Sequence, residues 1–355
     1  MQYEKALKGI GVSMTKKTVY HVKYNFFEAK AEEVKNELGK EGLKQVLKEM
    51  LLIRHFETRA ESAYQQGKVG GFFHAYMGQE AIQTAAVHAM GRESNWWVTT
   101  YRCHALALLN GATPDEMMAE LYGKVTGNAR GRGGSMHFYG DRMLGGFGIV
   151  GGHLPIATGA AFSLKYQKQE GVAVCFLGEG AFVQGAVHES LNLASLWNLP
   201  CIYIIENNQW GMGTAVNRAL CVQPIAEHFA PAYGMKAYTL DGMDFTQCYG
   251  GFKHIYEEVR KTERPVLVEA VTERFRGHSI SDPALYRCKK ELEAAKERDP
   301  IHLFSESLKK EKIITDKAFE AMDKEQKEIV MASMKFAEES PNPAPTTLEE
   351  DVFAP

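Results

Sequence analysis

The chain of 355 residues lacks several features that define common classes of protein. No run approaches the roughly 20 apolar residues that a helix needs to cross a bilayer, which argues against an integral membrane protein. Its six cysteines are scattered and form no C-x-x-C pair, which suits reduced thiols in the cytosol. A formal net charge of −3 provides no overall field that would attract nucleic acid or an anionic membrane.

The N-terminus also lacks the marks of a targeting segment. It has no apolar core region, and it contains no arginine before Arg54. We therefore expect a cytoplasmic protein. Residues 1–40 are polar and only partly periodic, which predicts an N-terminal extension, and residues 341–355 include P-N-P-A-P, which predicts an extended tail.

Residues 41–340 predict one α/β domain with a helical C-terminal part. Apolar residues recur at helical spacing from Glu41 to Gln66, and a helix with a small-residue face follows from Gln79 to Met90. Further along, strands and helices alternate, which favours an open, mostly parallel sheet with helices on both faces. The expected strands are 96–100, 172–177, 201–206, 237–240 and 265–270, and the expected helices of the alternating part are 156–166, 184–197 and 252–261.

Glycine and arginine concentrate in residues 127–153, which predicts a long irregular loop. Loops of this length are usually functional. Within it, residues 146–151 read G-F-G-I-V-G and match the G-x-G-x-x-G motif of dinucleotide-binding proteins. That motif requires a strand directly before it, and no strand is expected here, so an NAD-dependent oxidoreductase is the weaker alternative.

One carboxylate lies between two glycines at the end of a predicted strand, in G-E-G at residues 178–180. The next predicted strand ends in N-N. Because parallel strands joined by a right-handed crossover end at the same edge of a sheet, Glu179 and Asn208 are expected to be neighbours. A carboxylate, an amide oxygen and a backbone carbonyl such as that of Trp210 suit Mg²⁺, which usually completes its shell with waters and phosphates. The glycines would let a phosphate approach the backbone.

These motifs carry a resemblance to a known family. G-E-G followed by N-N resembles the thiamine diphosphate motif, and the surrounding sequence resembles the alpha subunits of the decarboxylating components of 2-oxo acid dehydrogenase complexes, above all those that act on pyruvate. The resemblance runs from about Glu41 to the C-terminus. The matching stretches include F-F-H-A-Y-M-G-Q-E-A (72–81), G-R-G-G-S-M-H (131–137), G-E-G-A-F-V-Q-G (178–185), E-N-N-Q-W-G-M-G (206–213) and R-G-H-S-I-S-D-P (276–283).

The resemblance implies roles for particular residues. Glu179, Asn208 and the main-chain oxygen of Trp210 would hold the metal ion. The other expected cofactor-binding residues are Tyr101, Arg102, Gly140, Gly148, Val150, Gly180, Ala181 and His278. His278 and His74 are the expected catalytic residues, and His278 suits proton transfer because the ordinary pKa of an imidazole lies near neutral pH.

The same resemblance implies an activity and its partners. It implies a decarboxylase that uses thiamine diphosphate and Mg²⁺ and passes the acyl group to a lipoyl-bearing acyltransferase component. Pyruvate is the expected substrate, with acetoin and branched-chain 2-oxo acids as alternatives. In this family a glutamate of the beta subunit activates the cofactor, so we expect an α2β2 heterotetramer of bacterial type. No nucleic acid or membrane partner is expected.

Glu179 departs from the family, which usually has aspartate at this position. The longer side chain reaches one methylene further into a site with tight metal–oxygen distances. We expect a small retreat of the strand end, or a carboxylate that folds back, with binding retained. A non-catalytic assembly subunit that has lost metal binding is a further alternative.

Overall fold

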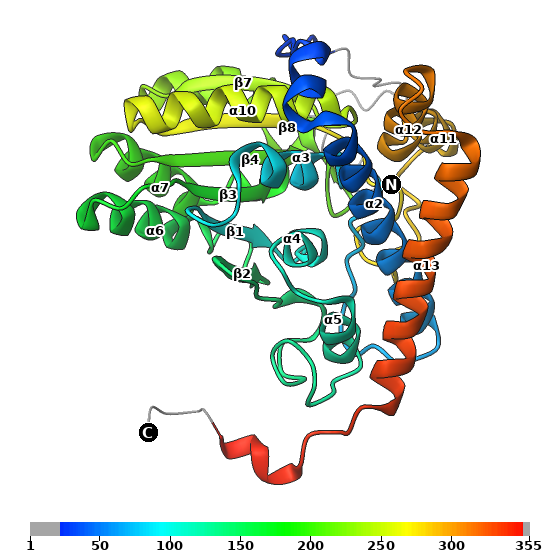
Figure 1. Cartoon of the computed structure of the whole chain (residues 1–355). Coiled ribbons are helices and arrows are strands. Elements are labelled where there is room, and N and C mark those ends of the chain that lie inside the picture. Colours follow the sequence, from blue (N-terminus) through cyan, green and yellow to red (C-terminus); the bar gives the residue numbers. More distant parts are fainter. Residues whose placement is uncertain (1–21, 351–355) are drawn as a thin grey trace, which may run out of the picture.

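A parallel β-sheet with helices on both faces forms the body of the protein (Figure 1). The computed structural model describes residues 22–350, and in this part of the chain six strands pair in the order β2-β1-β3-β4-β8-β7. The strands are β1 (Trp96–Thr100), β2 (Met143–Phe147), β3 (Ala173–Gly178), β4 (Cys201–Asn207), β7 (Lys236–Asp241) and β8 (Val266–Val271), and β5 (Trp210–Gly211) and β6 (Thr214–Ala215) form a separate hairpin. The predicted fold class is confirmed.

The central strands are apolar on both sides because each side is covered by helices. In β4, Ile202 and Ile204 face one core, whereas Tyr203 and Ile205 face the other. The first core is covered by α3 (Glu80–Met90), α4 (His104–Leu109) and α10 (Phe245–Thr262), and the second by α6 (Leu154–Gln167), α7 (Gly185–Leu196) and α9 (Ile225–Phe229). The short helix α8 (Val216–Ala219) follows the hairpin.

A second layer of helices lies outside the first core. The long helix α2 (Ala31–Gln65) packs against α3, and α13 (Asp316–Glu339) runs along α2 and α5 (Pro114–Leu121), as Figure 1 shows. The helices α11 (Lys289–Glu297) and α12 (Pro300–Lys310) connect β8 to α13. None of the helices within residues 22–350 is long and apolar enough to cross a membrane.

Both predicted terminal segments are partly structured. The first helix of the described residues, α2, begins at Ala31, ten residues before the expected start, and it tolerates one non-helical residue, Gly39, with φ 61°. Residues 341–350 lie beside the glycine-rich loop and the residues just before it: the Val125 N–H donates to the Pro341 carbonyl over 3.2 Å, and Arg132 donates to the Thr347 carbonyl over 2.7 Å. The remainders of the predicted extension and tail, residues 1–21 and 351–355, lie outside the described residues.

The expected start of one helix was wrong. Helix α10 begins at Phe245 rather than at residue 252, because the Asp244 carboxylate caps the N–H groups of Thr246 and Gln247. Gly250 and Gly251 lie within this helix, where an added Cβ would lie 2.4 Å from Ala29 and 2.4 Å from Leu240, respectively. These glycines allow the helix to pack closely on its neighbours.

The predicted irregular loop contains a strand, β2, which pairs with β1 through residues such as Thr99 and Gly146. The expectation that no strand precedes G-F-G-I-V-G was therefore wrong. However, β1 lies between β2 and β3 in the sheet, whereas the first two strands of a dinucleotide-binding fold are adjacent. The correction thus gives no support to the NAD-binding alternative.

Candidate active site

The carboxyl ends of β3 and β4 meet at one edge of the sheet. The register pairs Gly178 with Glu206, so the residues that follow each strand lie next to each other. Glu179 begins a single turn of 3-10 helix, and the Asn208 N–H donates to its Oε2 over 3.3 Å. The spacing in the sequence correctly predicted this proximity.

The Glu179 carboxylate is buried, with an exposed fraction of 2%. Within residues 22–350, its Oε1 has no hydrogen-bond partner. Burial raises the pKa of this carboxyl to about 7, while the Arg274 guanidinium and the Asn208 N–H act in the opposite direction. A buried anionic oxygen without a partner is costly unless a cation or donor is supplied, so this oxygen fits a metal ion.

Asn208 and Trp210 place two more oxygens beside this carboxylate. The Asn208 Nδ2 donates to Gln79 Oε1 over 3.3 Å, and its Oδ1 accepts from the Trp210 N–H over 3.3 Å. The Trp210 carbonyl accepts a hydrogen bond from Arg274 over 2.8 Å. A carbonyl oxygen has two lone pairs, so the donor set for a hard cation is retained.

Arg274 is the main residue of the site that the motif spacing did not reveal. Its guanidinium is almost fully buried and donates to the carbonyls of Trp210 (2.8 Å) and Met212 (2.7 Å) and to the Tyr286 hydroxyl (2.6 Å). It follows β8, which lies beside β4 in the sheet. The rule that the carboxyl ends of parallel strands share an edge, applied to β8, would have pointed to it.

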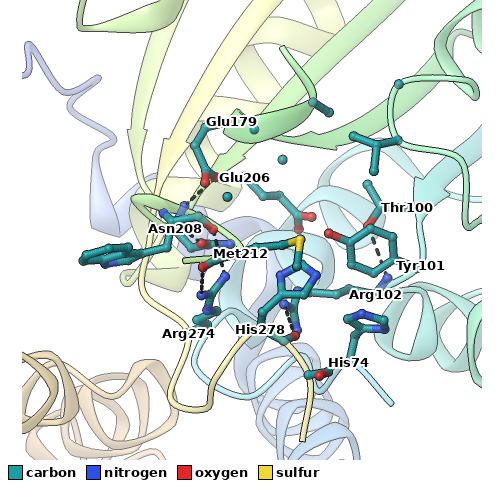
Figure 2. A pocket seen from close by; sticks show the side chains of 18 of the residues that line it. His74, Thr100, Tyr101, Arg102, Glu179, Glu206, Asn208, Met212, Arg274 and His278 are labelled. Carbon is teal, nitrogen blue, oxygen red and sulfur yellow. Dashed lines mark hydrogen bonds between the residues drawn. The ribbon is translucent and has the colours of Figure 1, made fainter. Parts of the chain in front are cut away.

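A cavity of about 560 Å³ opens at this edge of the sheet (Figure 2). Most of the residues predicted from the sequence line it: His74, Tyr101, Arg102, Gly148, Val150, Glu179, Gly180, Ala181, Asn208, Trp210 and His278. Gly140 does not line the cavity; it lies against Asn110. Lining residues that the sequence did not single out as site residues include Phe72, Gln79, Met136, Glu206, Met212 and Arg274.

Glu206 is a second buried carboxylate in the wall of the cavity. It accepts hydrogen bonds from the Tyr76 hydroxyl and, over 3.2 Å, from Gln83. Burial raises its pKa to about 7, and the neighbouring Glu179 carboxylate adds to this rise. The cavity therefore holds two carboxyl groups whose negative charge a bound cation would stabilise.

At the end of the cavity away from Glu179, three aromatic rings lie close together beside Arg102. The ring centroids of His74 and Tyr101 are 4.4 Å apart, and those of His74 and His278 are 4.9 Å apart. The buried Arg102 donates to the Ala75 carbonyl (2.7 Å) and to the His278 carbonyl (2.6 Å). One guanidinium thus holds together the two chain segments that carry the histidines.

Both histidines are neutral at pH 7. Burial, followed by the charge of Arg102, lowers the pKa of His74 to about 2 and that of His278 to about 3. The expectation that His278 has an ordinary imidazole pKa was therefore wrong. The Nδ1 atoms of both rings have no hydrogen-bond partner within the described part of the chain, so each can bond to a ligand in the cavity.

We expect the low pKa of His74 to make the protein sensitive to acid. Because the folded protein holds His74 neutral and the unfolded chain protonates it near pH 6.5, folding stability falls as the pH drops below about 6.5. Below the unfolded pKa, one such group lowers the free energy of unfolding by about 1.4 kcal/mol for each pH unit. The free energy of unfolding of His74→Gln, measured between pH 7 and 5, should decrease less steeply than that of the unmodified protein. Equal slopes would show that His74 is protonated in the fold.

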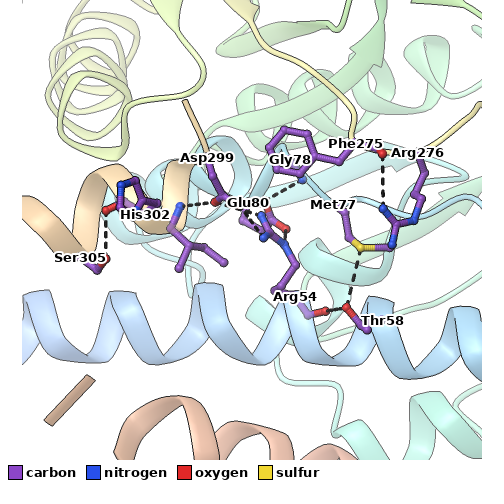
Figure 3. A network of polar contacts seen from close by, with 11 residues as sticks. Arg54, Thr58, Met77, Gly78, Glu80, Phe275, Arg276, Asp299, His302 and Ser305 are labelled. Atoms are coloured by element: carbon purple, nitrogen blue, oxygen red, sulfur yellow. Dashed lines mark hydrogen bonds and ion pairs between the residues drawn. The ribbon is translucent and has the colours of Figure 1, made fainter. Parts of the chain in front are cut away.

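A network of buried charges supports the segment that carries His74 (Figure 3). Arg54 on α2 pairs with Glu80 on α3 (2.5 Å) and with Asp299 at the start of α12 (2.7 Å). The second oxygen of Glu80 accepts the Gly78 N–H over 2.9 Å. Gly78 has φ +99°, and a Cβ there would lie 2.4 Å from the Glu273 carbonyl, so only glycine fits this crossing.

The glycine-rich loop is folded around another carboxylate, that of Glu120 on α5. Its two oxygens accept four backbone N–H groups over 2.6 to 3.1 Å, those of Ala129, Gly131, Gly133 and Gly134. These bonds shape the loop that places Met136 in the cavity wall. The loop is thus anchored to the first core.

Comparisons with known proteins identify the family of the chain. The family model described as "Dehydrogenase E1 component" matches residues 48–346. The pyruvate dehydrogenase E1 component subunit alpha of Rickettsia conorii is 42% identical over 308 residues, 86% of this chain and 94% of that protein. The subunit of the same name from Rhizobium meliloti is 39% identical over 320 residues, 89% of this chain and 91% of that protein. The chloroplastic subunit alpha-3 of Arabidopsis thaliana is 39% identical over 322 residues, 88% of this chain and 74% of that protein. The chain therefore belongs to the dehydrogenase E1 component family.

Proposed function

We propose that this chain is the alpha subunit of a pyruvate dehydrogenase E1 component. Relatives that carry this name align with most of the chain. The observation that carries the proposal is the buried Oε1 of Glu179, which has no hydrogen-bond partner among residues 22–350 and faces a cavity together with oxygens of Asn208 and Trp210. Dependence on thiamine diphosphate follows from the family, and Mg²⁺ is the metal that this oxygen donor set suits.

The residues of the cavity fit a magnesium diphosphate. Glu179, Asn208 and the Trp210 carbonyl would hold the metal, and the backbone around Gly180 would lie against the phosphates. Glycine suits the close packing of this turn on β5, because a Cβ on Gly180 would lie 3.1 Å from Gly211 Cα. Arg102 lines the same cavity and contributes positive charge.

When bound, thiamine diphosphate supplies the carbanion chemistry that releases carbon dioxide from a 2-oxo acid. The protein has to bind the substrate carboxylate and position it. His74 and His278 are the side chains available for this at the ring-lined end of the cavity, and both would act as neutral hydrogen-bonding groups. Pyruvate fits the names of the relatives, and acetoin and branched-chain 2-oxo acids are the competing substrates. Dye reduction by the complex with each of the three would identify the substrate.

A beta subunit is the partner that this family implies, and an α2β2 assembly is our proposal. Exposed apolar side chains gather on α6, α7 and the turn before α6, where Ile149 is 76% exposed and Leu196 is 67% exposed. Phe162 contacts both Tyr166 and Trp197 and forms an aromatic cluster on this surface. The surface is continuous with the cavity, because Val150 is exposed and also lines it. A partner that covers this face would also close the site.

We expect the isolated chain to be inactive. With pyruvate, thiamine diphosphate and Mg²⁺ it should show no decarboxylation, because the group that activates the cofactor would come from the beta subunit. Addition of that subunit should restore dye reduction and, with the lipoyl-bearing acyltransferase component, acetyl transfer. Robust turnover by the chain alone would contradict the proposal.

Calorimetric titration of thiamine diphosphate into the α/β complex, with and without Mg²⁺, tests the proposal as a whole. Binding that requires Mg²⁺ supports it. Absence of binding would favour a non-catalytic assembly subunit. Binding of NADH without a metal would favour a nicotinamide-dependent oxidoreductase.

A further inference from the structure

A short segment before the first described helix is fixed along the outer edge of the sheet. The Phe27 N–H donates to the Thr239 carbonyl of the edge strand β7 over 2.8 Å. The Phe27 ring lies 5.2 Å from that of His254 on α10. Two residues later, the Ala29 N–H donates to Gln247 Oε1 over 2.8 Å. These contacts give the segment a defined direction.

The segment extends toward the carboxyl end of β4, where Tyr24 contacts the turn that follows the strand. Gln209 Nε2 donates to the Tyr24 hydroxyl over 3.4 Å. Burial raises the pKa of Tyr24 to about 12, and the Glu269 and Glu179 carboxylates add to this rise. The hydroxyl is therefore protonated and lies within electrostatic range of Glu179, although Tyr24 does not line the cavity.

Gln209 is the residue between the two that supply oxygens to the metal site. Its φ of 71° lies in the left-handed region, which residues other than glycine adopt at a cost in free energy. The Gln209 N–H donates to Asn207 Oδ1 over 3.0 Å, and Asn207 Nδ2 donates to Glu269 Oε1 over 2.7 Å. The turn is thus held from behind by a polar cluster, and Tyr24 is the member that comes from the N-terminal segment.

We propose that Tyr24 is a positioning residue that holds the metal-binding turn, Asn208 to Trp210, from the side that faces away from the cavity. This inference rests on the proposed function, because it concerns the oxygens that would bind Mg²⁺. Magnesium demands near-ideal octahedral geometry, and the groups that orient its ligands contribute strongly to affinity. The N-terminal segment is then part of the cofactor site rather than a separate arm.

Two truncations test the inference in the α/β complex. One chain begins at residue 22 and keeps Tyr24, and the other begins at residue 27, which removes Tyr24 but keeps the anchoring contacts of Phe27 and Ala29. We expect the shorter chain to bind Mg²⁺ about tenfold more weakly at saturating thiamine diphosphate, measured by calorimetry and by tryptophan fluorescence, since Trp210 lies in the turn. The kcat at saturating Mg²⁺ and cofactor and the KM for pyruvate should change less than about twofold, because the chemistry itself is untouched.

Point variants separate the contribution of the Tyr24 hydroxyl to Mg²⁺ binding from that of the Tyr24 ring. Tyr24→Phe should weaken Mg²⁺ binding by about threefold to tenfold, which is the range of a single net hydrogen bond, and Tyr24→Ala should weaken it more. Glu28→Ala, on an exposed neighbour in the same segment, is the matched control and should bind as the unmodified complex does.

Equal Mg²⁺ affinity of the two truncations, or of Tyr24→Ala and Glu28→Ala, would overturn the inference. A loss of kcat at saturating Mg²⁺ without a change in Mg²⁺ affinity would overturn it as well. If the unmodified complex does not bind Mg²⁺ and thiamine diphosphate, the proposed function fails first. The two failures are therefore distinguishable.

Discussion

Glu179→Ala is expected to abolish Mg²⁺-dependent binding of thiamine diphosphate by the α/β complex. It removes the carboxylate that contacts Asn208 at the junction of β3 and β4, and no other described carboxylate bonds to Asn208. Loss of a group that merely orients a ligand already costs 10- to 100-fold in metal affinity, so loss of the ligand should cost at least about 100-fold. Calorimetric titration with and without Mg²⁺ measures this.

Two further substitutions show whether the charge or the shape of the Glu179 side chain is responsible for Mg²⁺ binding. Glu179→Gln keeps the size of the side chain and removes the charge, so it should also lose Mg²⁺ binding. Its melting temperature without metal should stay the same or rise, because burial disfavours the charged form of Glu179. Glu179→Asp, the residue usual in the family, should keep binding within about tenfold. Normal binding by Glu179→Ala would mean that the G-E-G motif has been misread.

Arg274→Met is expected to weaken Mg²⁺ and cofactor binding by about 100-fold. The substitution leaves the Trp210 and Met212 carbonyls without the hydrogen bonds from Arg274 and frees the turn between β5 and β6. Hydrogen bonds from a charged donor contribute about 1.5 to 3 kcal/mol each, and 1.4 kcal/mol corresponds to a tenfold change in affinity. Arg274→Lys should rescue little, since an ammonium group cannot reproduce the planar geometry of the guanidinium.

Arg276→Met is the matched control for this prediction. Arg276 lies two residues further on the same segment but forms an ion pair with Glu61 on α2, away from the cavity, and its side chain is 39% exposed. Its substitution should change Mg²⁺ affinity less than about threefold, in keeping with the small contribution of exposed ion pairs. Similar losses in both variants would mean that the segment, and not the Arg274 contacts, determines affinity.

Local patterns in the sequence were sufficient for five of the six strands of the sheet and for the central pair of the site. The apolar runs that became β3 and β4 predicted parallel strands, because strands covered on both faces are apolar throughout. The crossover rule then brought Glu179 and Asn208 together. Helix α10 was predicted too short because its glycines pack closely against other elements, which sequence periodicity does not reveal.

Other features depend on contacts between distant segments. Strand β2 has a glycine-rich sequence of low strand propensity, M-L-G-G-F, and it forms because β1 offers an edge for pairing. The low pKa of His278 arises from burial and from Arg102, a residue far away in the chain. A pKa set by burial is a property of the packed structure, so the type of residue alone suggested the wrong value.

The sequence by itself thus determined the family, the parallel sheet and the oxygen donors expected to bind the metal, because each of these depends on short motifs or on local periodicity. Only the tertiary structure revealed the groups that hold those donors: Arg274 behind the Trp210 carbonyl, Gln79 beside Asn208, and Tyr24 against Gln209. These partners come from separate segments with no fixed spacing to the motif. Their positions follow from packing, and packing depends on the whole chain.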